Sequence, residues 1–497
     1  MSETALVKCD SPGGFITYLP EQAIFRQQIL DKIRRVFERF GFDPIQTPAV
    51  EYLDVLTGGD EDSDMTLYEA RRIRGAGVPN DPIRTALRFD HTVPLARVVV
   101  ANWNELPRPF KRYVCGNVWR GEKPQAGRYR EFMQFDADIV GSSSMLADAE
   151  IVALMCATIL ELGIDRFKVR FNNRKILNGL PQFAGFDPEL IDQVLRQIDK
   201  LEKIGEDGVR EWLGNEQKKA MTQAEAQEYQ RWVWSLSDEE KKAEKNKIYG
   251  LGLPPEAVDR ILEFVAFEGT SDELLDQVEG ISEDNAVMSE GLAELREIIG
   301  YLRTMGVDES NWEVDLSVAR GLAYYSGPVF ETTLLDCAEM GSVFSGGRFD
   351  FLVQRFQEDS IPATGASIGV DRFFAALKEL GMAPSTKTTV QALVTVMDPA
   401  LMSQYLQLVG ALRDAGMNAA LYMAEEMSFK AQIAFAAKQE IPFVLIMGQR
   451  EADAGEVTIK DMKNRKQKTV SFKSLVSGER QALFDAFDGQ CLGRLLT

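Results

Sequence analysis

Residues 110–141 carry the pattern that most restricts how this chain can fold. The segment "FKRYVCGNVWR" is followed by the Gly- and Pro-containing loop "GEKPQAGRY" and then by "REFMQFDADIVG". Alternating residues on both sides of a turn-rich loop predict two antiparallel strands with a long connection. Because successive side chains of a strand point to opposite faces, Gln134, Asp136 and Asp138 share one face. We therefore expect a polar row on one face of an antiparallel sheet.

Several further segments extend this sheet and cover it with helices. Helical spacing of apolar residues predicts an amphipathic helix at 21–40, and residues 145–162 are predicted to form a strong helix. Between them, "DPIQTPAVEY" is an extended segment. Strand patterns recur in "RFKVRFNNRKIL", "WEVDLSVARGLAYYSGPVFETTLL", "GSVFSGGRFDFLV" and "TGASIGVDRFFAALKEL", the last of which enters a helix. The fold class predicted is α+β, with an antiparallel sheet flanked by helices.

At 497 residues the chain is too long for one compact core. From about 180 to 305 it becomes rich in Gln, Glu, Lys and Ala, which indicates a helical insertion, with its best helices in "NEQKKAMTQAEAQEYQRWVW" and "PPEAVDRILEFVAFEG". After "GMAPSTKTT", strands and helices alternate, as in a small α/β domain. The predicted division is a core at 1–178 and 308–384, an insertion at 179–307, a terminal domain at 388–482 and a tail at 483–497.

Composition excludes several classes of protein. Hydrophobic residues make up 45% and charged residues 27% of the chain, which is ordinary globular composition. No apolar run is long enough to span a membrane, and Met1–Pro12 do not resemble a secretory signal, so we expect a soluble, cytoplasmic protein. The five scattered cysteines predict neither a disulfide framework nor a zinc site.

The charge balance bears on nucleic acid as a partner. A net charge of -20 repels a polyanion at long range. A local cluster of basic residues can still bind RNA, since counterion release depends on the phosphates contacted. The terminal domain holds one such cluster, for which solubility is the alternative explanation: Lys460, Lys463, Arg465, Lys466, Lys468 and Lys473.

Two segments could bring charged groups to a ligand. Arg120 and Glu122 end the first strand of the 110–141 pair, where the arginine could hold a phosphate and the carboxylate an amino group or a metal ion. The alternative is a cross-strand ion pair on a solvated face. In "RGLAYYSGPVFE", Arg320 lies beside a glycine and two tyrosines, a pattern that also fits a packed aromatic strand.

Two other features are ambiguous. In "GASIGVDRFF", Gly365 and Gly369 precede a helix whose first turn carries Arg372, so either a nucleotide approaches closely or strand and helix pack tightly. The spacing is not a dinucleotide fingerprint. The only histidine, His91, allows no His-pair metal site and no obvious catalytic triad. A structural role is expected for it.

Taken together, these segments resemble the class II aminoacyl-tRNA synthetases, and specifically the histidyl-tRNA synthetase family, over nearly the whole chain. "TPAVEY" is similar to motif 1 at the dimer interface, "NVWRGEKPQAGRYREFMQFDADIVG" to motif 2 and "GASIGVDRF" to motif 3. "LRFDHTVPLAR" and "RGLAYYSGPVFE" are similar to the two elements that build the family's histidine pocket, and the segment from "VQALVTVM" onward is similar to its anticodon-binding domain.

The resemblance implies an enzyme that activates L-histidine with ATP and Mg2+, releasing pyrophosphate, and then esterifies it onto the 3' end of tRNA-His. It also implies a cytoplasmic homodimer with no membrane partner. Charge developing on the α-phosphate needs fixed cations around it. Arg120 and Arg320 are the catalytic residues implied, and no metal site is fixed by the protein alone.

The resemblance also assigns binding roles to residues of this sequence. Those implied for ATP are Arg120, Glu122 and Arg372. Those implied for histidine are Arg88, Asp90, Thr92, Gln134, Asp138, Arg320, Tyr324 and Tyr325. Asp90, Thr92 and Gln134 would meet the amino group, Asp138 and Tyr325 the imidazole, and Arg320 the carboxylate and the α-phosphate. The tRNA would meet Lys460, Lys463, Arg465, Lys466 and Lys468.

Two positions depart from the family. An aspartate usually stands where this chain has Ala323, and a tyrosine is common at Phe349. We predict that histidine affinity is reduced or re-tuned. Two rival hypotheses remain at this stage. One is a non-charging, histidine-binding paralogue resembling the regulatory subunit of ATP phosphoribosyltransferase, which lacks the terminal domain. The other is a class II synthetase for another amino acid, which "RGLAYYSG" argues against.

Overall fold

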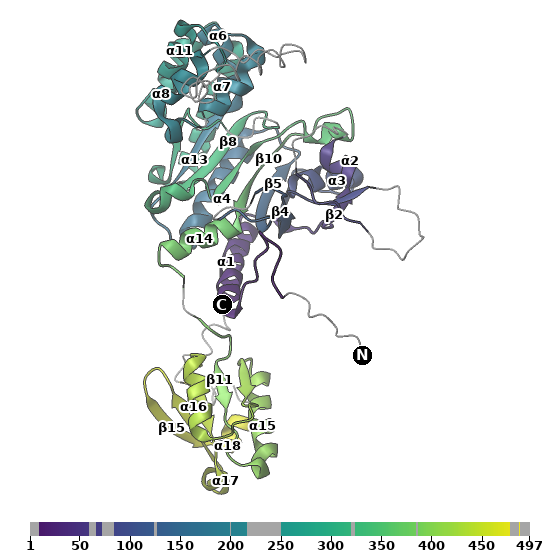
Figure 1. The fold of residues 1–497 in the computed structure, drawn as a ribbon, viewed down its shortest axis with the longest axis vertical. Helices are drawn as coiled ribbons and strands as arrows, with labels where there is room; N and C mark the ends of the chain where they lie inside the picture. Colours follow the sequence, from purple (N-terminus) through teal and green to yellow (C-terminus); the bar gives the residue numbers. More distant parts are fainter. Residues whose placement is uncertain are drawn as a thin grey trace, which may run out of the picture. The chain divides into compact units, whose positions relative to one another are not determined.

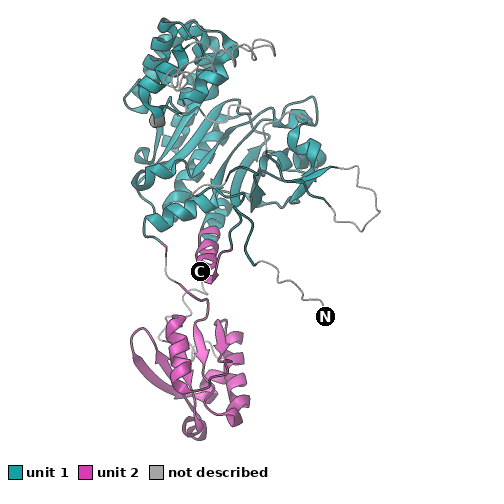
Figure 2. Cartoon of the chain, viewed as in Figure 1, with its two compact units in different colours: residues 1–16, 31–382 teal, residues 17–30, 383–497 magenta. Residues whose placement is uncertain are grey.

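The computed structural model describes residues 9–58, 66–71, 84–123, 127–198, 200–215, 250–319, 324–383, 386–477 and 487 (Figure 1). The chain forms two compact units, which are coloured separately in Figure 2. Unit 1 comprises residues 1–16 and 31–382, and unit 2 comprises residues 17–30 and 383–497. The domain bounds drawn from the sequence remain a prediction.

Unit 1 is built on an eight-stranded sheet in the order β1-β4-β5-β10-β9-β8-β6-β7. Its strands are β1 (Asp43–Pro44), β4 (Phe110–Trp119), β5 (Glu131–Val140), β6 (Phe167–Asn173), β7 (Trp312–Val314), β8 (Pro328–Leu334), β9 (Phe344–Arg348) and β10 (Ala363–Gly369). β4 and β5 pair antiparallel over their full length, as predicted. A separate two-stranded sheet joins β2 (Val50–Tyr52) and β3 (Thr85–Leu87).

The predicted antiparallel sheet flanked by helices is confirmed, with parallel pairing at the two edges. β1 runs parallel to β4, and β7 runs parallel to β6, so the sheet is mixed. The two edge strands are only two and three residues long. Strands this short carry almost no periodic pattern, and their direction is set by the connections that bring them to the sheet.

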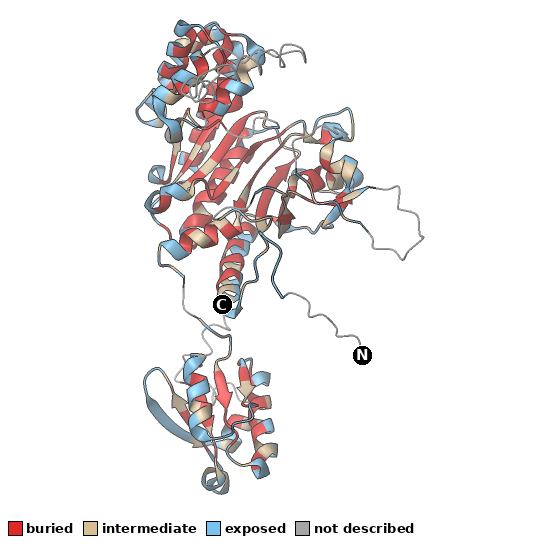
Figure 3. Ribbon diagram, in the orientation of Figure 1, coloured by how far each residue is buried: buried red, intermediate tan, exposed pale blue. Residues whose placement is uncertain are grey.

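Helices cover one face of the sheet. They include α1 (Pro20–Arg39), α4 (Met145–Glu161) and α14 (Val370–Glu379), with α2 (Leu53–Thr57), α3 (Thr92–Asn102) and α5 (Arg174–Asn178) elsewhere in the unit. The ring of Phe37 in α1 lies 4.9 Å from that of Phe135 in β5 and 6.5 Å from that of Phe344 in β9. All three rings are buried, and buried residues follow the strands and the inner faces of the helices in Figure 3. Because Phe135 packs under α1, its neighbours in β5 must face the other way.

The insertion is helical in the part of it that the structure describes. Its helices are α6 (Leu180–Ala184), α7 (Ile191–Ile198), α8 (Leu201–Gly214), α11 (Pro255–Val265), α12 (Ser271–Ser282) and α13 (Ala286–Thr304). The predicted helix within 215–234 lies almost wholly outside the described residues. α13 packs against α4 and α5 of the core.

Unit 2 contains a five-stranded sheet in the order β12-β11-β13-β14-β15. The strands are β11 (Ala392–Val394), β12 (Ala419–Leu421), β13 (Phe443–Ile446), β14 (Glu456–Asp461) and β15 (Lys466–Ser471), and the helices are α15 (Met402–Asp414), α16 (Phe429–Lys438), α17 (Gln449–Ala454) and α18 (Phe472–Val476). β11, β12 and β13 are parallel, as the predicted alternation of strands and helices requires. The antiparallel hairpin of β14 and β15 was not predicted as strands.

Candidate active site

A cavity of about 690 Å³ opens on the face of the large sheet that carries the polar row of β5. That volume is typical of a small-molecule site. Its lining includes Asp90, Thr92, Arg120, Glu122, Gln134, Asp136, Asp138, Arg196, Lys200, Tyr324, Tyr325, Phe349, Gly365, Ser367, Gly369, Asp371 and Arg372. Most of the residues predicted from the sequence to bind histidine or ATP therefore meet in one place.

β5 supplies the floor of the cavity. Gln134, Asp136 and Asp138 line it, whereas Phe135 and Ala137 between them are buried on the opposite face. The polar face predicted from the period of the strand is confirmed. Asp136 and Asp138 are each only 3% exposed, so both carboxyl groups lie deep in the cavity.

Arg112 of β4, which sequence reasoning missed, holds the Asp138 carboxylate. It stands directly opposite Asp138 in the strand pairing, and its Nη2 lies 2.5 Å from Asp138 Oδ2. Arg112 is fully buried. Burial raises the pKa of Asp138 to about 6, while the positive charge of Arg112 lowers it. The ion pair therefore keeps Asp138 available as a hydrogen-bond acceptor near neutral pH.

The glycine-rich strand β10 leaves room for that carboxylate. Gly365 pairs with Asp138 in the sheet, and a Cβ on Gly365 would lie 2.0 Å from Asp138 Oδ1 and 2.6 Å from the Ala137 carbonyl oxygen. At Gly369 the nearest atom to an added Cβ is Arg372 Cβ, at 3.9 Å. Close packing against the neighbouring strand β5 accounts for Gly365, a strand-to-strand contact that was not predicted from the sequence.

The segment before α3 forms another wall. Asp90 Oδ1 accepts a hydrogen bond of 3.0 Å from the Val93 backbone N–H at the start of the helix. Burial raises the pKa of Asp90, and the hydrogen bond from Val93 lowers it. Thr92 lines the cavity beside it. The two side chains that the resemblance assigns to the amino group thus stand together with Gln134.

His91 and Arg88 have structural contacts behind this wall. His91 Nε2 lies 3.1 Å from the Gly116 carbonyl oxygen, and burial, with the positive charges of Arg88 and Arg112, lowers the His91 pKa to about 3. This histidine is neutral, as expected for a structural role. Arg88 donates to the carbonyl oxygens of Thr47 at 2.8 Å and Asn117 at 3.0 Å. Arg88 is not among the residues that line the cavity, so the contacts of Arg88 indicate a supporting role and not a contact with histidine.

Two tyrosines face the acidic floor. The hydroxyl oxygens of Tyr324 and Tyr325 lie 3.2 Å apart, within hydrogen-bond distance. In such a pair one hydroxyl hydrogen is used between the two oxygens and the other stays available. Burial raises the pKa of Tyr325 well above its usual range, so it remains a neutral phenol. Arg320 and Ala323, from the same motif, lie outside the described residues.

Cations line the end of the cavity near the loop between β4 and β5. Arg120 donates from Nε to the Phe89 carbonyl oxygen at 3.2 Å, and its guanidinium lies 5.2 Å from the ring centroid of Phe132. Arg372 donates from Nη1 to the Ser342 carbonyl oxygen at 2.8 Å. These contacts fix both guanidinium groups, and the Arg120 guanidinium has other N–H groups that can meet a ligand. Glu122, on the same loop as Arg120, is exposed.

The insertion also reaches the cavity, which the sequence did not predict. Arg196, from α7, and Lys200, just after it, line the rim and are exposed. Like Arg112, these are site residues that sequence reasoning missed, whereas Asp136 was placed on the polar face of its strand but was given no role. In the sequence, two basic residues at the end of an amphipathic helix do not indicate which surface of the protein they will face.

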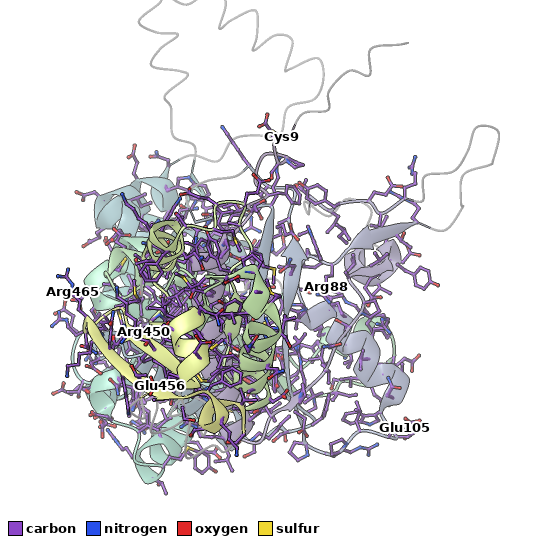
Figure 4. The ribbon with its side chains drawn as sticks, turned by 90° about the horizontal axis from the view of Figure 1, so that it is seen from below. Cys9, Arg88, Glu105, Arg450, Glu456 and Arg465 are labelled. Atoms are coloured by element: carbon purple, nitrogen blue, oxygen red, sulfur yellow. The ribbon has the colours of Figure 1, made fainter. Side chains whose placement is uncertain are left out.

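The basic cluster of unit 2 lies on the β14–β15 hairpin. Lys463, Arg465, Lys466 and Lys468 are exposed, and Figure 4 shows the Arg465 side chain extending away from the ribbon. β15 is an edge strand of its sheet. Lysines on an edge strand also prevent pairing with other chains, so the cluster has a structural explanation beside the one proposed for tRNA.

Among the residues that the structure describes, one group has ligand atoms close enough together to hold a metal ion: Cys337, Glu339 and Glu379. Its members do not line the cavity. The four described cysteines are free thiols. None of the helices found in the described ranges is both long and apolar enough to cross a bilayer.

Comparisons with known proteins indicate one family over most of the chain. The sequence model of the family described as "Histidyl-tRNA synthetase" matches residues 14–373, and "Anticodon binding domain" matches residues 391–479. The chain is 39% identical to "Histidine--tRNA ligase" of Wolinella succinogenes over 474 residues, which cover 94% of this chain and 97% of that protein. It is 39% identical to the protein of the same name from Paracoccus denitrificans over 472 residues, or 92% of this chain and 90% of that one.

Solved structures show the same likeness. The histidyl-tRNA synthetase of Nostoc sp. PCC 7120 superposes with a TM-score of 0.77 at 32% identity, covering 96% of this chain and 100% of that one. A Bacillus halodurans structure titled "ATP phosphoribosyltransferase regulatory subunit/histidyl-tRNA synthetase" has a TM-score of 0.66 at 21% identity, covering 87% of this chain and 97% of that one, and shows the fold alone.

Proposed function

The chain belongs to the histidyl-tRNA synthetase family, and from this premise we propose that it activates L-histidine with ATP and transfers it to tRNA-His in the cavity of unit 1. The observation that carries the proposal is the meeting of the β5 acidic row, the tyrosine pair and two arginines in one cavity. Family membership and the retained anticodon-binding domain favour charging over the non-charging paralogue.

Histidine would lie along β5. Gln134 Oε1 has no hydrogen-bond partner among the described residues and, with Asp90 and Thr92, offers acceptors for the α-ammonium group. Asp138 accepts from one imidazole N–H, and the tyrosine pair meets the second ring nitrogen. A buried acid and phenol would be left unpaired by an aliphatic substrate. A site of this kind discriminates by roughly 10⁴–10⁵, so editing is unnecessary.

ATP would place its phosphates between the arginines. The histidine carboxylate attacks the α-phosphorus and pyrophosphate leaves, so negative charge increases on the equatorial oxygens. Arg120 and Arg372 line the same cavity as Asp138 and can stabilise that charge from fixed positions. We assign Arg320, on the strength of the family motif, to the substrate carboxylate and the α-phosphate.

Mg2+ fits this site through its oxygen chemistry. The cavity presents carboxylate oxygens, the ligand type that Mg2+ prefers, and Glu122 offers one beside Arg120. When bound, the ion would neutralise charge on the ATP phosphates. The phosphates themselves would supply further oxygen ligands.

Transfer to tRNA follows in the same cavity. The terminal ribose 3'-hydroxyl attacks the carbonyl carbon of the adenylate, and AMP leaves. Because the acyl-adenylate is already activated, positioning contributes more than a strong base. Unit 2 would bind the anticodon, with the β14–β15 hairpin lysines as candidate contacts. The proposed compartment is the cytoplasm.

A homodimer is proposed from the segment similar to motif 1. In β2, Glu51 is buried and paired with Arg97 at 2.7 Å, whereas Val50 and Tyr52 on either side are 43% and 57% exposed. Apolar side chains this exposed on a short two-stranded sheet favour contact with a second copy. Sedimentation should give a dimer for the wild type and a shift towards monomer for Tyr52→Asp.

The test is ATP–pyrophosphate exchange with each amino acid, followed by charging of tRNA. Histidine alone should support exchange, and Arg320→Ala should abolish both exchange and charging. Histidine binding without exchange would support the non-charging paralogue. Exchange driven by glycine, threonine or proline would contradict the histidine assignment.

A further inference from the structure

Asp136 is a buried carboxyl group of the cavity that has no role in the mechanism above. It lies between Gln134 and Asp138 on the cavity face of β5 and is 3% exposed. Within the described residues its Oδ1 has no hydrogen-bond partner. A buried, unpartnered carboxylate oxygen is costly, and at a ligand site it indicates a group that the ligand satisfies.

The charges of Arg112 and Arg88 act on Asp136, and each arginine also has another partner. Nε and Nη1 of Arg112 have no hydrogen-bond partner among the described residues. Arg112 of β4 is paired with Asp138, and Arg88 donates to the carbonyl oxygens of Thr47 and Asn117. His91 is neutral, because burial and the neighbouring arginines lower its pKa to about 3. Asp136 therefore lacks a dedicated cation in the part of the chain that the structure describes.

The other neighbours of Asp136 are acidic or uncharged. Ser367 stands opposite it in β10, and Asp138 and Asp90 both add negative charge near it. The negative charge of Asp136 also raises the pKa of both Tyr324 and Tyr325. Burial raises the pKa of Asp136 to about 7, although the attraction of Arg112 lowers it. The free site thus places three carboxyl groups, those of Asp90, Asp136 and Asp138, near one another, and Arg112 is the cation whose charge acts on all three.

Histidine brings the complementary charge. Its α-ammonium is positive throughout the physiological range, and its imidazole takes a second proton at about pH 6.5. Resting on the function proposed above, we propose that Asp136 is a further substrate-binding residue, which provides the counter-charge for histidine bound with its ring as imidazolium. Asp138 then accepts from one ring N–H, and the second N–H faces the phenolic oxygens and Asp136.

The proton that converts the bound ring to imidazolium can come from two sources, and the proton count is conserved in each case. When Asp136 is protonated in the free enzyme, its O–H bond breaks as an N–H bond forms on the ring, giving a carboxylate and an imidazolium. When Asp136 is already ionised, one proton is taken from solvent. Above about pH 7 the second route applies, since the Asp136 pKa lies at about 7, and between about pH 6.5 and 7 the first applies. Below about pH 6.5 histidine arrives with its ring already protonated, and Asp136 releases its proton to solvent.

Proton uptake by the wild-type enzyme tests the proposal first. Calorimetric titration with histidine at pH 8, in buffers of different ionisation enthalpy, should show uptake approaching one proton per site. Binding of a neutral ring would give none. Absence of uptake at pH 8 in the wild type overturns the proposal without any variant.

A triazole analogue identifies the group that takes the proton. 1,2,4-Triazolyl-3-alanine has nearly the shape of histidine, but its ring stays neutral near pH 7. It should bind at least about 10-fold more weakly than histidine and with no proton uptake, since each pKa unit gained by the ring corresponds to a factor of ten in affinity. Uptake with the analogue would place the proton on Asp136 and not on the ring, and would overturn the proposal.

Asp136→Asn keeps the shape and removes the charge. At pH 8 this variant should lose proton uptake and most of the preference for histidine over the triazole, while its KM for ATP stays within about 2-fold. Unchanged uptake and preference would contradict the role of Asp136. If histidine exchange were absent in the wild type, the proposed function itself would fail, so the two failures are distinguishable.

Discussion

Gly365→Ala tests the proposal that the Asp138 carboxylate must occupy its observed position. An added Cβ would lie 2.0 Å from Asp138 Oδ1 and 2.6 Å from the Ala137 carbonyl oxygen. The first atom belongs to a side chain held by Arg112 at 2.5 Å, and the second belongs to the backbone of a buried strand. Neither atom can move without disturbing the pair or the sheet.

The expected magnitude follows from these distances. Ordinary van der Waals contact begins near 3.4 Å, so Asp138 Oδ1 must shift by more than about 1 Å. A displacement of about 1 Å in a site costs on the order of 100-fold in rate. Overpacking a buried strand costs about 1–3 kcal/mol of stability. We therefore expect kcat/KM for histidine to fall about 100-fold while the protein remains folded at 25 °C.

The assay is histidine-dependent ATP–pyrophosphate exchange, with thermal melting of the same samples. Gly300→Ala is the matched control, since it makes the same chemical change within α13, where an added Cβ meets nothing within 4 Å. This control should keep wild-type exchange and gain up to about 1 kcal/mol. Wild-type kcat/KM in Gly365→Ala would refute the idea that the Asp138 position governs activation.

Three further predictions concern charge. Arg112→Met should lower the free energy of unfolding by about 3–5 kcal/mol, because it leaves the Asp138 carboxylate without its cation. The loss should be larger at pH 8 than at pH 5. Urea denaturation at both pH values measures it, and an unchanged free energy of unfolding would refute the prediction. Asp136→Asn should be more stable than the wild type at pH 8, by up to about 4 kcal/mol, because raising a carboxyl pKa from 3.8 to about 7 favours the protonated form in the folded state. In the wild type, the stability that depends on a protonated Asp136 is present in full below about pH 4 and is lost as the pH rises through 7. The difference in unfolding free energy between variant and wild type should therefore shrink towards low pH. A difference that does not change with pH would contradict this prediction. Ala323→Asp should lower the KM for histidine by restoring acidic support to Arg320; a normal wild-type KM, unchanged in the variant, would contradict this.

The sequence predicted those parts of the site that depend on the regular spacing of polar and apolar residues along one strand or helix. The two-residue repeat of β5 placed Gln134 and Asp138 on one face, and the structure confirms it. Helices α1 and α4 follow from apolar spacing in the same way. Asp136 belongs to the same face and was seen there, but no motif gave it a task.

Other parts depend on tertiary structure. Arg112 meets Asp138 only through the register of β4 and β5, which the connecting loop and the rest of the sheet determine. Arg196 and Lys200 reach the cavity because the insertion packs where it does. The β14–β15 hairpin was missed because its lysine-rich strands lack an apolar alternation. Arg88 was assigned to histidine from a motif, but its hydrogen bonds go to backbone carbonyl groups.

The central claim is that one cavity binds the imidazole of histidine at its acidic end and the phosphates of ATP at its arginine end. A crystal structure of the enzyme with histidine and a non-hydrolysable ATP analogue measures this directly. The account predicts a ring nitrogen within hydrogen-bond distance of Asp138, the second one facing the Tyr324–Tyr325 pair, and Arg120 on a phosphate. A ring bound away from Asp138, or phosphates bound away from Arg120 and Arg372, would contradict it.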